Sequence, residues 1–232
     1  MCSGGNSDGH DELRYVKERY LHKDGLRSAI ARVCNALFTA RDPAIWGEAT
    51  TAVASDSKQF GAWDQNLMTE YHARYGGRGI MVYWHVDKHS ACVHSQTKAC
   101  SSSEVAAMIE GVMRHETTME IEKTYVDSHG QSEIGFAFCH LLGFSLLPRL
   151  KHMKKQRLYR VEKSDLEEYA NLKSVFTRTI DWGLIEQQYD EMVKFATALR
   201  LGTADAETIL RRFTRGTVHP TYKALGELGK AV

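Results

Sequence analysis

Two aspartates are the residues of this sequence best suited to chemistry. Asp56 follows the short, partly β-branched run 51–55, and Asp127 follows the alternating run 119–126, so we predict that each carboxylate lies at the end of a strand. Strand ends can bring two carboxylates together, and their oxygens suit Mg²⁺. Two such ions could clamp the attacking and leaving oxygens of a phosphoryl transfer. The alternative is that both are turn or cap aspartates, whose side chains accept nearby backbone N–H groups.

Cysteine and histidine patterns favour no other metal chemistry. The five cysteines are odd in number and form no C-x-x-C pair, which is typical of reduced thiols in a cytosol. The eleven histidines include no H-E-x-x-H pair, so we assign none of them to a metal. A zinc site assembled from distant Cys and His residues is the alternative.

Length and composition indicate an ordinary globular protein. The chain has 232 residues, with 43% hydrophobic and 25% charged residues and only three prolines, which predicts one large domain or one domain with an appended piece. No apolar run approaches the roughly 18 residues that span a bilayer, and the polar N-terminus has no signal-peptide core. We therefore expect a cytoplasmic protein.

The charge is distributed unevenly along the chain. A net charge of +1 argues against nucleic acid as a partner, yet residues 149–160 hold six basic side chains and no acid. The rest of the chain then has 24 basic against 29 acidic residues. We predict that this segment contacts DNA phosphates, with a solvated charged face as the alternative. Its basic residues are Arg149, Lys151, Lys154, Lys155, Arg157 and Arg160.

Smaller candidates surround the two aspartates. Lys58, two residues after Asp56, could contact the DNA backbone, and His129, two residues after Asp127, could touch phosphate or tune a metal site. A solvated lysine and a turn histidine are the alternatives. The aromatic run 83–85 lies in a predicted strand, where core packing is favoured over base stacking. A weaker second basic patch lies at 211–215.

Hydrophobic periodicity and turn residues predict a mixed α/β order. Expected strands cover 51–55, a hairpin at 80–86 and 90–95, then 119–127 and 144–148; expected helices cover 26–39, a segment beginning after 101–103, 134–142, a segment from residue 182, 204–213 and a segment from residue 220. We expect residues 1–50 to form a tail and helical lead-in, 51–160 a core domain that is partial, and 161–232 a helical part.

Several longer motifs resemble one family. They are AVASDSKQF at 52–60, WH at 84–85, CSSSEV at 100–105, YVDSHG at 125–130, GF at 143–144, LPRL at 147–150, LRLGT at 199–203 and RRF at 211–213. Together they are similar to the catalytic domain of the Tn-three family transposases, the large enzymes of replicative bacterial transposons. The resemblance runs from about residue 13 to residue 232.

This resemblance implies a fold, a reaction and partners. The fold would be RNase H-like, a mixed sheet flanked by helices, with an Asp-Asp-Glu triad that holds two Mg²⁺ ions, or Mn²⁺ as a substitute. Asp56 matches the first acidic residue of the triad and Asp127 the second. The ions would activate water to nick the 3′ transposon ends, and then the freed 3′-OH to attack target DNA. DNA and other transposase subunits would be the partners, in the bacterial nucleoid.

The third carboxylate departs from the family pattern. The resemblance places it in a helical Glu-Asn-Trp-Asn motif downstream of residues 219–230, and no such motif occurs in this sequence. We therefore expect an incomplete fold and a chain that is inactive alone, as in an internal fragment, a decayed remnant or a split reading frame. Substitution by Glu186, Asp190 or Glu191 is the alternative, although these acids are typical of a solvated helix face. A non-catalytic DNA-binding remnant and an RNase H-like nuclease are the alternative functions.

Overall fold

A six-stranded mixed sheet lies at the centre of the computed structural model, which describes residues 9–47, 51–73, 75–128, 130–163 and 165–232. Its strands are β1 (Ala52–Gly61), β2 (Glu70–His72), β3 (Gly77–Asp87), β4 (Cys92–Lys98), β5 (Lys123–Val126) and β6 (Ser145–Pro148). The strand order is β2-β3-β1-β5-β6, and β4 pairs with β3. Strand β3 pairs antiparallel with β1 and with β4. Strand β5 pairs parallel with β1 and with β6. This arrangement confirms the expected mixed α/β fold, a mixed sheet flanked by helices.

Strand β1 is longer than the sequence predicted. The expectation that the first strand ends at Asp56 is wrong, because β1 continues to Gly61 and Asp56 lies in its middle, opposite Trp84. The continuation 57–60 is largely polar and resembled a turn. It stays extended because β3 supplies hydrogen bonds along its whole length, and because alternate side chains of this part of β1 face solvent. The hairpin prediction is confirmed by β3 and β4.

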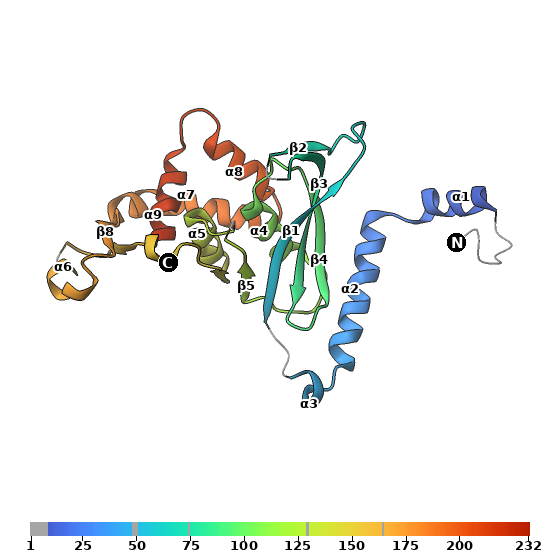
Figure 1. Ribbon diagram of the computed structural model, residues 1–232, viewed down its shortest axis with the longest axis horizontal. Helices are drawn as coiled ribbons and strands as arrows, with labels where there is room; N and C mark the ends of the chain where they lie inside the picture. The colour runs from blue at the N-terminus through green and yellow to red at the C-terminus, as the bar shows by residue number, and fades with distance from the viewer. Residues whose placement is uncertain (1–8, 48–50, 74, 129, 164) are drawn as a thin grey trace.

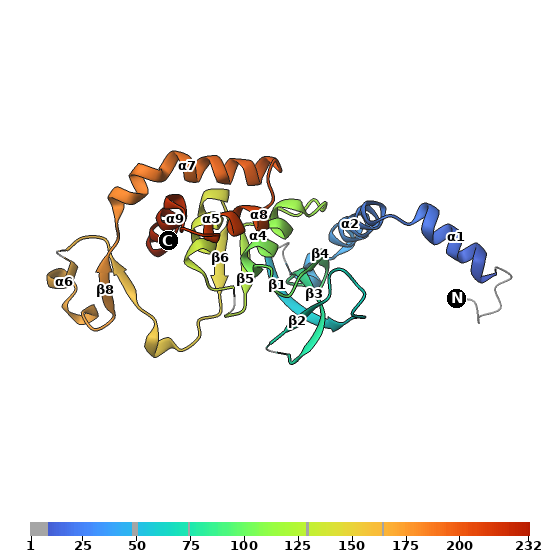
Figure 2. The same cartoon turned by 90° about the horizontal axis from the view of Figure 1, so that it is seen from above.

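Helices flank the central sheet and extend beyond it. They are α1 (His10–Tyr20), α2 (Lys23–Ala40), α3 (Pro43–Trp46), α4 (Glu104–Arg114), α5 (Glu133–Leu142), α6 (Asp165–Glu168), α7 (Trp182–Leu201), α8 (Ala206–Thr214) and α9 (Pro220–Ala231). Helix α4 packs on β3 and β4, α5 packs on β6, and α7 to α9 form an outer layer over α4 and α5 (Figure 2). A single buried cluster therefore continues from β3 through α4 and α5 into α7, α8 and α9.

Capping side chains explain the boundaries of the two inner helices. Helix α4 begins after Ser103, whose side chain accepts the Ala106 N–H, and α5 begins after Ser132, whose side chain accepts the Gly135 N–H. Helix α5 ends at Gly143, which has a φ of 86° in the left-handed region that favours glycine. Both helices were predicted, α4 after the serines 101–103 and α5 over 134–142, but the cap Ser132 was not.

The segments at the two ends of the sheet differ in how they pack. Helix α2 packs on β4, whereas α1 has no buried residue and extends away from the body (Figure 1). After β6 the chain passes through the 3₁₀ turn Met153–Lys155 to a small parallel pair, β7 (Leu158–Arg160) and β8 (Phe176–Thr179), with a second 3₁₀ turn, Ala170–Leu172, between them. The small sheet was not predicted.

In the part of the chain that the structure describes, no helix is long and apolar enough to cross a membrane.

Candidate active site

Parallel pairing of β1 with β5 brings the two predicted aspartates to neighbouring positions. The last registered pair of these strands is Ser55 with Val126, and the next residues along the two strands are Asp56 and Asp127. Asp56 is exposed, and Asp127 is half-buried directly after the end of β5. The two carboxylates named from the sequence are thus adjacent across the sheet, although they lie 71 positions apart in the chain.

Each carboxylate also accepts a backbone hydrogen bond. One Asp56 oxygen accepts the Ser57 N–H at 2.7 Å, and one Asp127 oxygen accepts the Gly130 N–H at 3.4 Å. The turn after Asp127 is tight, because a Cβ on Gly130 would lie 2.6 Å from a methyl group of Val126. The Asp127 bond belongs to a turn, as the alternative interpretation expected, whereas Asp56 accepts its bond within strand β1. Both bonds orient the carboxylates that the metal interpretation requires.

A third carboxylate, Glu104, lies near this pair. The first residue of α4 accepts the Ser57 hydroxyl at 2.7 Å, so it is tied to the residue that follows Asp56. Burial raises the pKa of Tyr83, and the negative charges of Glu104, Asp56 and Asp127 raise it further. All three carboxylates therefore act on one buried phenol, which stays protonated. Glu104 was not predicted as a site residue, since an acidic residue in the first turn is common in helices.

A buried polar cluster lies on the inner side of the sheet at the same level. The Ser55 hydroxyl lies 2.7 Å from Nδ1 of His85 and 3.1 Å from the Thr124 hydroxyl, which links β3, β1 and β5. The three residues are 3%, 0% and 0% exposed. Burial lowers the pKa of His85 to about 3, so its imidazole is neutral at pH 7. Sequence reasoning had placed His85 in the core but had not found its partners.

The aromatic run in β3 divides between the two faces of the sheet. Tyr83 and His85 are buried, as expected, whereas Trp84 points to the other face, where it is half-buried. There it meets Phe60 edge-to-face, with ring centroids 5.9 Å apart. The exposed Asp56 lies on the same face, opposite Trp84 in the β1–β3 register.

The basic segment 149–160 begins beside the aspartates. The Arg149 N–H donates to the Val126 carbonyl at 2.9 Å, one residue before Asp127. Within the segment, five of the six predicted basic side chains are exposed; the exception is Arg160, whose guanidinium donates to the Thr177 carbonyl in the small sheet. The exposed side chains are Arg149, Lys151, Lys154, Lys155 and Arg157. Lys58 on β1 is also exposed, and the predicted His129 lies outside the described residues.

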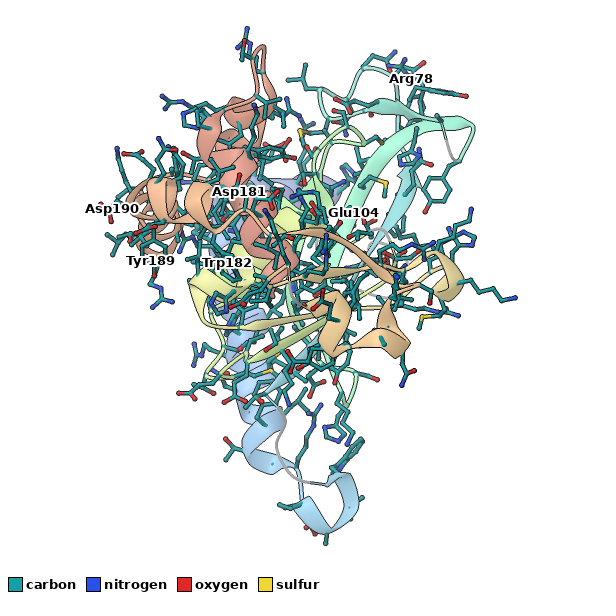
Figure 3. All side chains as sticks on the ribbon, turned by 90° about the vertical axis from the view of Figure 1, so that its left-hand side faces the viewer. Arg78, Glu104, Asp181, Trp182, Tyr189 and Asp190 are labelled. Atoms are coloured by element: carbon teal, nitrogen blue, oxygen red, sulfur yellow. The ribbon has the colours of Figure 1, made fainter. Side chains whose placement is uncertain are left out.

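The three helix acids considered as substitutes all lie on α7. Glu186 and Asp190 are exposed, and Glu191 pairs with Lys194 at 3.3 Å on the same helix. Figure 3 shows Asp190 well apart from Glu104. Within the described ranges, no three Asp, Glu, His or Cys side chains lie close enough to hold a metal ion, and Cys34, Cys92, Cys100 and Cys139 are free thiols. Two adjacent carboxylates nevertheless fit Mg²⁺, which commonly takes one or two from a protein.

Comparison with known proteins gives one family and several relatives. A family model described as the Tn3 transposase DDE domain matches residues 1–232. The transposase of transposon Tn1546 from Enterococcus faecium is 25% identical over 95% of this chain, and that of Tn2501 from Escherichia coli is 28% identical over 94%. The transposase of insertion sequence IS1071 from Comamonas testosteroni is 29% identical over 87%.

The same comparisons set the extent of the likeness. The chain spans about a fifth of the length of these relatives, 22%, 22% and 21% respectively. Among solved structures, the Mos1 mariner paired-end complex with Mn is similar with a TM-score of 0.29 and 11% identity, over 92% of this chain and 62% of that one.

Proposed function

Because the chain belongs to the Tn3 transposase DDE domain family, we propose that Asp56 and Asp127 are the first two carboxylates of a site for metal-dependent phosphoryl transfer on DNA. The observation that supports this role is the β1–β5 register, which makes these two residues neighbours. Mg²⁺, or Mn²⁺ in its place, would supply charge neutralisation and an activated oxygen nucleophile. The reactions would be nicking at the 3′ transposon ends and transfer of those ends to target DNA.

The residues of this chain would hold and orient the reacting groups. Asp56 and Asp127 offer oxygen ligands whose directions are restrained by the Ser57 and Gly130 N–H groups. Such phosphoryl transfers need positioning and charge neutralisation and no covalent enzyme intermediate. Tyr83 stays a neutral phenol, because burial and the three nearby carboxylates raise its pKa.

The basic segment 149–160 is our proposed track for the DNA backbone. It starts one strand away from Asp127, so a phosphate chain bound along it would lead toward the carboxylates. Lys58 and His129 are proposed as additional contacts near Asp56 and Asp127. Other transposase subunits would bind the same DNA, and association with the nucleoid would follow from that binding.

We further propose that these 232 residues do not catalyse the reaction alone. Among the described residues, neither Glu104 nor the α7 acids lie close enough to the two aspartates to complete a metal site. The third carboxylate of the triad would therefore come from elsewhere in a complete transposase. The alternative functions are DNA binding without chemistry and a nuclease activity unrelated to transposition.

A nicking and joining assay tests this proposal. The 232-residue protein is expected to bind transposon-end DNA without nicking it in Mg²⁺ or Mn²⁺. Joined to the segments of a curated relative that lie outside the matched region, it should nick and transfer ends. Asp56→Asn or Asp127→Asn in the joined protein should then lower the rate roughly a thousandfold, because each removes a metal ligand worth several kcal/mol in the transition state.

Three results would contradict parts of the proposal. Nicking by the 232-residue protein itself would show that a residue inside it completes the site. Wild-type transfer rates in the Asn variants would remove both aspartates from catalysis. Nicking of any duplex without end joining would favour the nuclease. As a control, Asp190→Asn changes an exposed acid on α7 and should leave every rate unchanged.

A further inference from the structure

We propose that the buried chain of hydrogen bonds Thr124–Ser55–His85 is a positioning device that holds Asp56 and Asp127 at the separation needed to share a metal ion. The inference rests on the proposed function of the two aspartates. It assigns a role to three residues that touch neither metal nor DNA and act only through the strands that carry the carboxylates.

Ser55 and Thr124 lie on the two strands that carry the two aspartates. Ser55 directly precedes Asp56 in β1, and Thr124 lies in β5 three residues before Asp127. Side chains alternate along a strand, so Ser55 points inward while Asp56 points to the open face. The hydroxyls of Ser55 and Thr124 lie 3.1 Å apart and therefore join β1 to β5, the two strands that carry the carboxylates. They do so on the inner face of the sheet.

The cluster also joins a third strand, β3, and helix α4. Nδ1 of His85 on β3 lies 2.7 Å from the Ser55 hydroxyl, and the ring packs against Gly111 of α4, where a Cβ would come within 1.8 Å of Nε2. Among the residues that the structure describes, Nε2 forms no hydrogen bond, so the Ser55 hydroxyl supplies the side-chain hydrogen bond of this ring. The ring is thus fixed between α4 and β1, and the Ser55 hydroxyl lies between His85 on one side and Thr124 on the other.

These three hydrogen-bonded polar side chains lie in a part of the sheet core where apolar residues would be expected. The neighbouring inward-facing residues Val53 and Val126 are buried and apolar, as is usual in the core of a sheet. Buried hydroxyls cost desolvation free energy unless they are paired, so an apolar core would be the simpler solution. Unlike apolar contacts, hydrogen bonds are directional, and they resist sliding or spreading of β5 relative to β1.

Manganese binding measured by NMR on the 232-residue protein tests this role. Mn²⁺ broadens amide signals near its site, and we expect it to broaden those of Asp56 and Asp127 before that of Asp190, an exposed acid on α7. Ser55→Ala and Thr124→Val should raise the Mn²⁺ concentration required by about tenfold, the effect typical of outer groups that orient metal ligands. Thr124→Ser keeps the hydroxyl and should restore binding.

A matched variant separates positioning from stability. Thr221 on α9 is as fully buried as Thr124, and its hydroxyl also makes one side-chain hydrogen bond, 2.9 Å to Gln188. Thr221→Val should lower the Tm about as much as Thr124→Val and leave Mn²⁺ binding unchanged. If Ser55→Ala does not fold, Thr124→Val and Thr124→Ser carry the comparison.

The outcomes distinguish this inference from the function on which it rests. Wild-type Mn²⁺ affinity in Ser55→Ala and Thr124→Val would overturn the positioning role and leave the metal site intact. Equal loss of affinity in Thr221→Val would also overturn it, since general destabilisation would then be the cause. If Mn²⁺ does not select Asp56 and Asp127 in the wild-type protein, both this inference and the proposed metal site fail.

Discussion

Gly111 is the residue on which the packing of α4 against the sheet depends most directly. A Cβ at this position would lie 1.8 Å from Nε2 of His85, and the His85 side chain is fully buried and tied to Ser55. Gly111→Ala should therefore lower the free energy of unfolding by about 1–3 kcal/mol, the usual cost of overpacking. This loss should appear although alanine favours a helix by about 1 kcal/mol over glycine. Urea unfolding followed by circular dichroism measures it.

A second helical glycine supplies the control. Apart from its chain neighbours and the backbone of its own helix, Gly25 in α2 has no described atom within 4 Å of the position that a Cβ would take. Gly25→Ala should be neutral or stabilising by up to about 1 kcal/mol, because only helix propensity changes. If the two substitutions have the same effect, the contact between α4 and His85 does not restrain the fold.

The candidate site was predictable residue by residue only in part. Asp56 and Asp127 could be selected because each is an acid after a β-branched run, and because the motifs around them are long. Their adjacency depends on the register of β1 and β5, and sequence patterns do not specify which strands pair. Ser55 and Thr124 were missed for the same reason: a hydroxyl residue in a strand is ordinary until its partner, 69 positions away, is known.

Among the elements, α9 is tied to β8 and to the start of α7 through one buried acid. Glu227 pairs with Arg178 and with Lys230, and it accepts the Asp181 N–H at 3.1 Å. Burial alone would raise the pKa of Glu227, but the hydrogen bonds from Arg178, Lys230 and the Asp181 backbone outweigh burial and lower the pKa to about 2. The ionised carboxylate therefore stabilises the junction of these three elements.

This junction predicts a particular acid dependence of stability. Because the folded pKa lies below the ordinary value of 4.5, the stabilisation is complete above about pH 4.5 and is lost as pH falls toward about 2. Since Arg178 is half exposed, we expect Glu227→Gln to cost about 1–2 kcal/mol at pH 7. The variant should also lose less stability than wild type between pH 4.5 and 2 in urea titrations.

An exposed acid on the neighbouring helix completes the comparison. Glu186→Gln on α7 should keep the wild-type stability at pH 7 and the wild-type acid dependence. A Glu227→Gln protein whose stability falls with acid as steeply as wild type would show that this carboxylate does not hold the three elements together.

Elements with local signals were predictable, and those that depend on distant pairing were not. Helices α4 and α5 carry serine caps, and α5 and α7 end at the left-handed glycines Gly143 and Gly202, so their limits follow from nearby residues. Strand β1 beyond Asp56 is polar and is held by β3. The β7–β8 pair has two short strands and forms only because the chain returns after the segment 161–175.

At the scale of the whole molecule, the nearly neutral net charge conceals a basic path that starts beside the carboxylates. Lys151, Lys154 and Lys155 lie on the exposed connection between β6 and β7, and in the described structure none of them takes part in an ion pair. If this connection holds DNA phosphates, replacing all three by alanine should weaken DNA binding roughly tenfold or more at moderate salt. The slope of log K against log salt should fall by about 2–3, since each phosphate contact contributes about 0.9.

Fluorescence anisotropy with a labelled duplex over a range of salt concentrations measures both quantities. The comparison variant replaces Arg211, Arg212 and Arg215, which removes the same formal charge from α8 and the residue after it. There Arg211 is already paired with Glu207 at 2.5 Å, so fewer phosphates should be released and the slope should change by less than about 1. Equal changes in the two triple variants would mean that DNA affinity depends only on the total charge. An unchanged slope in the lysine variant would show that these lysines do not contact DNA phosphates.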